Sequence, residues 1–244
     1  MATSEKARGF LQNIFATSAT AKERLGRVRR TDDGRTFMYC KAGASALAAG
    51  KITIAEALNA TWVDEAITAG TVQAIGAQTF TLTITAAGAA ISENQFQGGY
   101  LQINDKTACG TQYLIDSNTA VAASGTSITL TLDEPIRVAL DATSEFTLVS
   151  SLGWKVTHTA TALGRGAGVP PVAVPAGYFF WNQIGGVANV LVAGTIGVGI
   201  LVCVSGGVAG AIHTLGTLTH SPVGQMIEAG VNTEYQPIRL MLGY

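Results

Sequence analysis

The sequence predicts a mainly β protein: a basic N-terminal arm with a short helix, then two small antiparallel β-sandwich or barrel domains. Three observations support this prediction: two-residue alternation of apolar side chains, turn residues between the alternating runs, and few charged residues. Of the 244 residues, 48% are hydrophobic and 13% are charged, about half the usual charged share of roughly 25%. This composition, rich in Gly and Thr, is more typical of an oligomer or a shell than of a lone soluble enzyme.

Residues 1–50 are predicted to form the basic arm and an Ala- and Gly-rich linker. Residues 1–51 hold ten Lys and Arg against four Asp and Glu, so the arm suits an acidic partner. Apolar residues at 10, 11, 14 and 15 share one face of a helix, and residues 20–23 resemble a capping box. We expect deletion of residues 1–30 to leave the body folded and to weaken partner binding.

The arginine cluster of this arm is the expected partner-binding site. Acidic residues interrupt the cluster and few aromatic residues lie between the arginines, so a protein partner is favoured over nucleic acid. A solvated helix with no partner remains the alternative. The residues expected to bind the partner are Phe10, Phe15, Arg27, Arg29, Arg30 and Arg35.

Residues 51–162 are predicted to form the first β domain. Residues 79–85, 127–132 and 145–148 alternate apolar residues with Thr or other polar residues. Such alternation predicts strands with one buried face, and β-branched Thr suits the other face. Turn residues lie between these runs, as in a sandwich or barrel.

Residues 163–244 are predicted to form a second small β-barrel-like domain. Its Gly- and Pro-rich start, residues 163–175, marks the boundary, and short strands are expected at 178–183, 188–192, 200–204, 208–212 and 237–242. The aromatic run at 178–181 predicts a subunit interface formed by Tyr178, Phe180 and Trp181. The alternative is a strand buried on both faces.

The strongly apolar stretch from residue 187 to residue 212 has the length of a membrane helix. Glycines interrupt it, β-branched residues come in short bursts, and no Lys or Arg cluster flanks it. These features favour short buried strands separated by Gly turns. A membrane span or pore-forming hairpin remains the alternative.

No residue pattern indicates catalysis, a cofactor or a metal, so we predict that the chain is not an enzyme. Three unpaired cysteines fit free, mostly buried thiols in a reducing cytosol. The three histidines lack neighbouring Cys or carboxylate residues at metal-ligand spacing. The start of the chain lacks the apolar run of a secretory signal. The cysteines are Cys40, Cys109 and Cys203, and the histidines are His158, His213 and His220.

Three stretches resemble virion structural proteins of tailed bacteriophages, in particular capsid cement or decoration proteins. The first is residues 31–44 with Leu47 and Gly50-Lys51, similar to a "DGR-x-F, then Lys-Ala-Gly-Ala" opening. The second is residues 94–101 and 110–115, similar to a "Gly-Tyr-Leu … Gly-x-x-Tyr-x-Ile" hairpin. The third is residues 176–183 with later glycines and a closing strand pair over 231–242, which looks like the small barrel of cement proteins.

The resemblance implies a protein that binds the major capsid protein lattice and stabilises the head. It also implies a homo-oligomer, often a trimer, that is made in the host cytoplasm and lies on the capsid surface of the virion. Neither nucleic acid nor a membrane is an expected partner. Alternatives are a tail, neck or fibre-base component, or a membrane-active or glycan-binding virion module.

Overall fold

The structure is a computed structural model that describes residues 9–85, 90–161, 164–216 and 220–243. The predicted fold class is confirmed, since the chain is mainly β and contains several antiparallel sheets. It divides into two compact units, each with its own core. We call residues 58–151 the middle unit, and residues 9–57 together with 152–244 the discontinuous unit.

This division differs from the predicted one. Residues 9–50 form no separate arm, and the middle unit ends at residue 151, before the Gly- and Pro-rich segment. The reason is long-range pairing: residues 36–41 form a strand that pairs with residues 179–185. Sheet pairing therefore joins the two ends of the chain into one unit.

The predicted N-terminal helix is wrong for the described part of that segment. Residues 9–30 contain two short strands and no helix, while residues 1–8 lie outside the described residues. Glu23, expected to cap a helical turn, accepts a hydrogen bond from the Leu11 N–H (2.5 Å) and forms an ion pair with Arg27. Tertiary contacts of this kind override a weak local helix preference.

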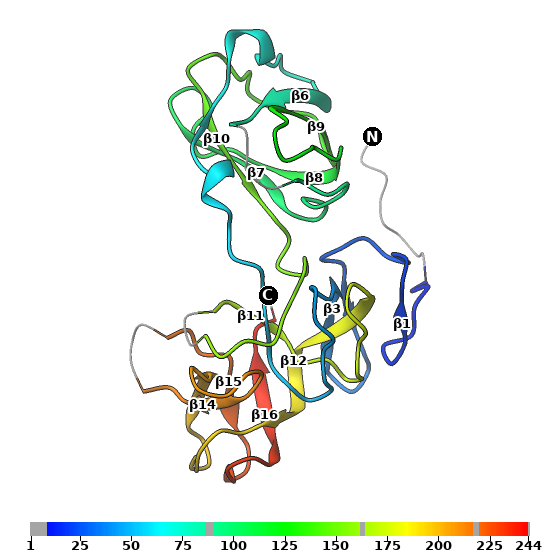
Figure 1. Ribbon diagram of the computed structural model, residues 1–244, viewed down its shortest axis with the longest axis vertical. Helices are drawn as coiled ribbons and strands as arrows, with labels where there is room; N and C mark the ends of the chain where they lie inside the picture. Colours follow the sequence, from blue (N-terminus) through cyan, green and yellow to red (C-terminus); the bar gives the residue numbers. More distant parts are fainter. Residues whose placement is uncertain (1–8, 86–89, 162–163, 217–219, 244) are drawn as a thin grey trace. The chain divides into compact units, whose positions relative to one another are not determined.

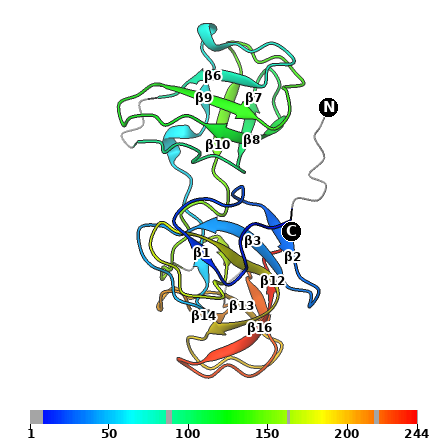
Figure 2. The same cartoon turned by 90° about the vertical axis from the view of Figure 1, so that its right-hand side faces the viewer.

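The middle unit is one antiparallel sheet with the order β5-β10-β7-β8-β9-β6. In Figures 1 and 2 this sheet, drawn in cyan to green, curls around its interior. Two short 3-10 helices, Ala60–Trp62 and Ala69–Thr71, precede most of it. The strands are β5 (Glu65–Ala66), β6 (Thr79–Thr83), β7 (Tyr100–Asp105), β8 (Gln112–Asn118), β9 (Ser127–Leu132) and β10 (Glu145–Val149).

The alternation predicted for β6 and β9 is confirmed. Phe80 and Leu82 are buried on one face of β6, whereas Thr79 and Thr81 are exposed on the other. The two exposed threonines lie opposite Thr131 and Thr129 of β9, with hydroxyl–hydroxyl distances of 3.1 and 2.9 Å. Cross-strand Thr pairs keep the outer face polar without charges.

Ten strands lie in the described residues of the discontinuous unit. Their bounds are β1 (Thr17–Ser18), β2 (Val28–Arg30), β3 (Thr36–Lys41), β4 (Thr53–Ile54), β11 (Gly166–Gly168), β12 (Phe179–Leu191), β13 (Leu201–Val204), β14 (Ile212–Thr214), β15 (Gly224–Met226) and β16 (Tyr235–Met241). The main sheet has the order β14-β13-β15-β16-β12-β3-β2, with β1 also paired to β12. A parallel bridge between Val192 and Ile212 joins the end of β12 to β14 and closes a small barrel.

Strand β12 connects the two parts of this unit. Its first half pairs with β3 and β1, and its second half pairs with β16. The register shifts between Gln183 and Gly185, and Gly186 has a φ of 81°. A Cβ at Gly186 would lie 2.9 Å from the Cα of Arg35, so only glycine fits this bend. The predicted strands 178–183 and 188–192 are thus one strand.

The apolar stretch 187–212 forms the end of β12, then β13 and the start of β14, which confirms the prediction of short strands. Only the expected strand at 208–212 is misplaced, since β14 begins at Ile212. Within the described part of the chain, no helix has the length and hydropathy needed to span a bilayer.

Candidate protein-binding surface

The N-terminal segment packs on the sheet face formed by β3 and the first half of β12. Ile14 joins Phe37, Tyr39 and Trp181 in one buried cluster. Figure 2 shows β1, β2 and β3 beside β12. Burial of three large aromatic side chains contributes roughly 1.5–3 kcal/mol each, so this segment belongs to the core of the unit.

Gln12 holds the segment in place. Its buried amide accepts a hydrogen bond from the Tyr39 hydroxyl (2.7 Å) and donates to the backbone carbonyl oxygens of Phe179 and Ala16 (3.1 and 2.8 Å). Its own backbone oxygen accepts from the Trp181 indole N–H at 2.9 Å. Buried polar groups require such partners, and these bonds fix the residues on either side of Gln12.

Phe10 lies directly on this anchored region. Its ring packs edge-on against Trp181, with centroids 5.3 Å apart and an interplanar angle of 83°. The guanidinium carbons of Arg27 and Arg29 lie 4.6 and 4.7 Å from the Phe10 centroid. Phe10 is still 39% exposed, so this arginine–aromatic stack is accessible at the surface.

Two further contacts orient the arginines. Glu23 is buried and forms an ion pair with Arg27, and Arg29 donates to the Gln12 carbonyl oxygen at 3.3 Å. Both guanidinium groups are therefore held over the Phe10 ring. Preorganised arginines lose less side-chain entropy when they bind a partner.

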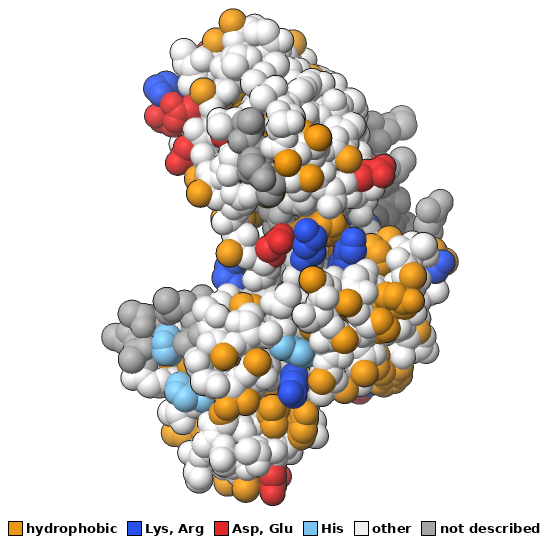
Figure 3. All heavy atoms as spheres, viewed as in Figure 1, with side chains coloured by type: hydrophobic (Ala, Val, Ile, Leu, Met, Phe, Trp, Pro, Cys, Tyr) orange, Lys and Arg blue, Asp and Glu red, His pale blue; other side chains and the backbone are white. Residues whose placement is uncertain are grey.

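Exposed apolar side chains extend the surface. Leu11 is 77% exposed and Phe15 is 56% exposed. Figure 3 shows hydrophobic side chains gathered near the position of β1 in Figure 1, next to basic side chains. We define the arginine–aromatic surface as Phe10, Leu11, Phe15, Arg27 and Arg29.

The structure thus brings together part of the predicted partner-binding set. Phe10, Arg27 and Arg29 form one stack. Arg30 is exposed on β2, where alternation points its side chain away from that of Arg29. Whether any of these residues binds a partner stays a prediction.

Arg35 has a local role in the turn between β2 and β3. Its Nε donates to Asp33 at 2.7 Å, and its guanidinium lies 5.4 Å from the Phe37 ring centroid. The hydroxyl of Thr31 and the backbone N–H of Arg35 lower the pKa of Asp33 to about 2. Arg35 stabilises this turn and does not belong to the arginine–aromatic surface.

The predicted subunit interface is wrong for two of its three residues. Phe180 and Trp181 are fully buried inside the discontinuous unit, and Tyr178 is partly buried against the same unit. Phe180 packs with Met38 and Cys40 on one side of the sheet, whereas Trp181 lies in the cluster on the other side. The alternative of a strand buried on both faces is correct here.

Cys203 lies close to two histidines in the barrel. Its Sγ is 3.4 Å from His213 Nδ1 and 3.6 Å from His220 Nδ1. His213 is on β14 and His220 precedes β15, and these strands flank β13 on opposite sides. Among the described residues, no group of three His, Cys, Asp or Glu side chains is arranged to hold a metal ion. Burial raises the pKa of the Cys203 thiol, unlike that of a reactive cysteine.

The sequence did not indicate the buried residues that hold the arginine–aromatic surface in position. Gln12 belonged to no pattern and Glu23 was assigned to a capping box, because their partners Tyr39, Trp181 and Leu11 lie 12 to 169 residues away along the chain. The signal that the sequence provided was the arginine cluster and the apolar residues of the same segment.

Comparison of the chain with protein-family models, with curated proteins and with solved structures found no match.

Proposed function

We propose that this chain is a non-catalytic structural protein that binds neighbouring protein subunits through the arginine–aromatic surface. The observation that supports this most directly is the exposed Phe10 ring with two oriented arginines stacked on it, next in the chain to exposed Leu11 and near exposed Phe15. Aromatic residues and Arg are enriched in protein interfaces and dominate their binding energy.

As the specific partner we propose the major capsid protein lattice of a tailed bacteriophage, with this chain as a cement or decoration protein. This assignment rests on the resemblance of residues 31–51, 94–115 and 176–183 to such proteins. A cement protein needs adhesive surfaces and stable small β domains. Many copies on one lattice would multiply a modest contact and stabilise the head by mass action.

Binding to phage heads tests this proposal. The purified chain is mixed with heads of the source particle that have been stripped of accessory proteins, and the heads are then sedimented. We expect saturable binding with hundreds of copies per head and a higher temperature of head disruption. A ring of about a dozen copies would instead indicate a tail or neck component, and no binding at saturating concentration would contradict both assignments.

Leu11→Asp places a charge on the proposed surface without disturbing the core, because Leu11 is 77% exposed. We expect this variant to bind heads at least about ten-fold more weakly, as when an interface residue worth about 1.4 kcal/mol is lost. The matched control is Val198→Asp, at a 65% exposed position between β12 and β13. Equal weakening by the two substitutions would argue against a specific role of the arginine–aromatic surface.

A further inference from the structure

The discontinuous unit contains a pocket of about 770 Å³ that is separate from the arginine–aromatic surface. Three segments form its walls: residues 41–44, 54–57 and 176–177, joined by Lys155 and Thr157. The volume lies within the range of roughly 300–1,000 Å³ that is typical of ligand sites.

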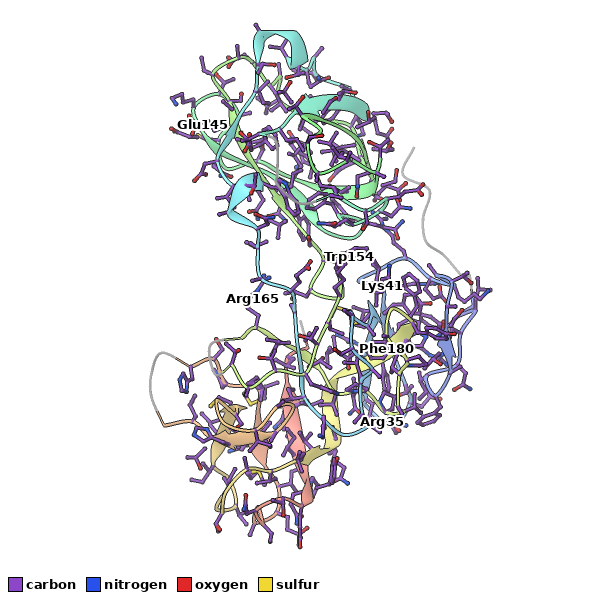
Figure 4. The ribbon with its side chains drawn as sticks, in the orientation of Figure 1. Arg35, Lys41, Glu145, Trp154, Arg165 and Phe180 are labelled. Carbon is purple, nitrogen blue, oxygen red and sulfur yellow. The ribbon has the colours of Figure 1, made fainter. Side chains whose placement is uncertain are left out.

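Two lysines line this pocket, and the ammonium groups of both lie against the ring of Trp154. The Lys41 and Lys155 ammonium nitrogens lie 4.6 and 5.4 Å from the Trp154 ring centroid, and Lys41 also lies 5.3 Å from that of Phe179. In Figure 4 the labelled Lys41 and Trp154 side chains lie close together. Stacking on the indole orients both cations without neutralising them.

The charges around the pocket are unbalanced. No ion pair joins Lys41 or Lys155 to a carboxylate in the part of the chain that the structure describes. Burial and the charge of Lys155 lower the pKa of Lys41. These conditions favour an added anion, which would relieve the repulsion between the two cations.

One carboxylate of this chain, Glu56, also lines the pocket. Burial raises its pKa, and the positive charge of Lys155 partly offsets this effect. Arg165 donates from its guanidinium to the Glu56 carbonyl oxygen at 2.8 Å, which adds a third cation nearby. The lining itself holds two cations against one carboxylate and is net positive, and Arg165 lies outside the lining.

The walls favour a peptide side chain over a nucleotide. Apart from the charged residues they are mostly small and aliphatic, including Ala42, Ala44 and Ile54. Trp154 is 2% exposed, so its face cannot stack on a base. Single-stranded nucleic acid sites need accessible aromatic faces, whereas the methylene groups of Glu or Asp suit an aliphatic wall.

We propose that this pocket binds a carboxylate of an acidic peptide segment of a partner protein, with Lys41 and Lys155 as the charged contacts. The ligand's carboxylate would accept charge-assisted hydrogen bonds from the two ammonium groups while its aliphatic stem contacts the alanine wall. This inference goes beyond the proposed capsid function and does not depend on it.

The test measures binding of a fluorescein-labelled, end-capped hexaglutamate peptide to the full chain by fluorescence anisotropy. Hexaglutamine is the uncharged comparison peptide, and unlabelled inorganic phosphate is the competing anion. We expect saturable binding of hexaglutamate that weakens with added salt. Lys41→Gln and Lys155→Gln should each lower affinity about ten-fold.

Two variants keep the test decisive. Lys51→Gln is the matched control, because Lys51 belongs to the same unit but does not line the pocket. Ala44→Phe fills space at an exposed part of the lining while both cations remain, and we expect it to weaken binding. It serves as an independent check if Lys41→Gln perturbs the packing of Trp154.

Three results would overturn the proposal. One is the absence of saturable hexaglutamate binding, and another is equal affinity of the Lys41, Lys155 and Lys51 variants. The third is displacement of the peptide by phosphate at an equal concentration, since it would indicate recognition of any small anion rather than of a peptide carboxylate. None of these results bears on sedimentation with phage heads, so the two proposals fail independently.

Discussion

His158 illustrates how a single side chain links two segments of the discontinuous unit. Its Nε2 accepts a hydrogen bond from the Ala48 N–H at 2.9 Å, and its Nδ1 lies 3.0 Å from the Ile52 carbonyl oxygen. A backbone N–H only donates and a carbonyl oxygen only accepts, so the partners define a neutral ring protonated on Nδ1. A second proton on Nε2 would displace the Ala48 contact.

We therefore expect stability to fall in mild acid. Burial and the charge of Lys51 lower the pKa of His158 below its usual 6.5. The unfolded state then takes up a proton before the folded state does, so stability is lost as pH falls from about 6.5 toward the lower, folded-state pKa. The measurement is the free energy of unfolding in urea between pH 7.5 and 5.5.

His158→Gln is the control, because glutamine can donate and accept but does not titrate. The variant should show a shallower dependence of stability on pH than the unmodified chain. The same slope in both proteins would assign the effect to other groups.

At the scale of elements, β2 pairs with β3 and β1 pairs with β12 in one sheet, and the segment around Gln12 and Ile14 packs on a face of that sheet. This segment contacts Phe37, Tyr39 and Trp181, all of which are fully buried. This packing replaces the expectation that residues 1–30 are dispensable for folding. It also means that the arginine–aromatic surface is rigidly attached to the unit.

Deletion of residues 1–30 should therefore unfold or strongly destabilise the discontinuous unit. The loss exposes three large aromatic side chains, each worth roughly 1.5–3 kcal/mol, and leaves the Trp181 N–H without its partner. Urea unfolding followed by tryptophan fluorescence measures the change. Leu11→Asp, which keeps the whole segment, should unfold like the unmodified chain, and full stability of the deletion variant would contradict the packing.

At the scale of the whole molecule, the middle unit is continuous in sequence, and it is inserted between the two parts of the discontinuous unit. Each unit has its own core, and every core residue of the middle unit lies between Trp62 and Leu148. All strands that pair within that sheet also come from residues 58–151. A unit with its own core and complete strand pairing can fold alone.

We expect residues 58–151, produced alone, to fold and unfold cooperatively. Far-ultraviolet circular dichroism during urea unfolding should show one transition between a β spectrum and a coil spectrum. A shorter fragment, residues 58–132, lacks β10, which pairs with both β5 and β7, and should remain unfolded. Absence of a cooperative transition in the longer fragment would show that the middle unit depends on the rest of the chain.

Of the candidate site, the sequence indicated residue types rather than an arrangement. The basic cluster of the arm and the apolar helix face predicted over residues 10–15 marked Phe10, Arg27 and Arg29 as interface candidates. The two arginines stack on Phe10, and Phe10 packs against Trp181; no spacing rule covers a separation such as that between residues 10 and 181. Lys41 and Lys155 meet at Trp154 for the same reason.

The sequence by itself determined the β class and the strands with clear alternation, such as β6 and β9, because a period of two is local and directly assigns one buried face. It also determined that residues 187–212 form short strands, because their glycines interrupt the apolar run. Only the tertiary structure decided that residues 9–57 join residues 152–244 and that the first half of β12 is buried on both faces. Strand pairing over such separations depends on which apolar surfaces fit together, and local periodicity contains no information about that fit.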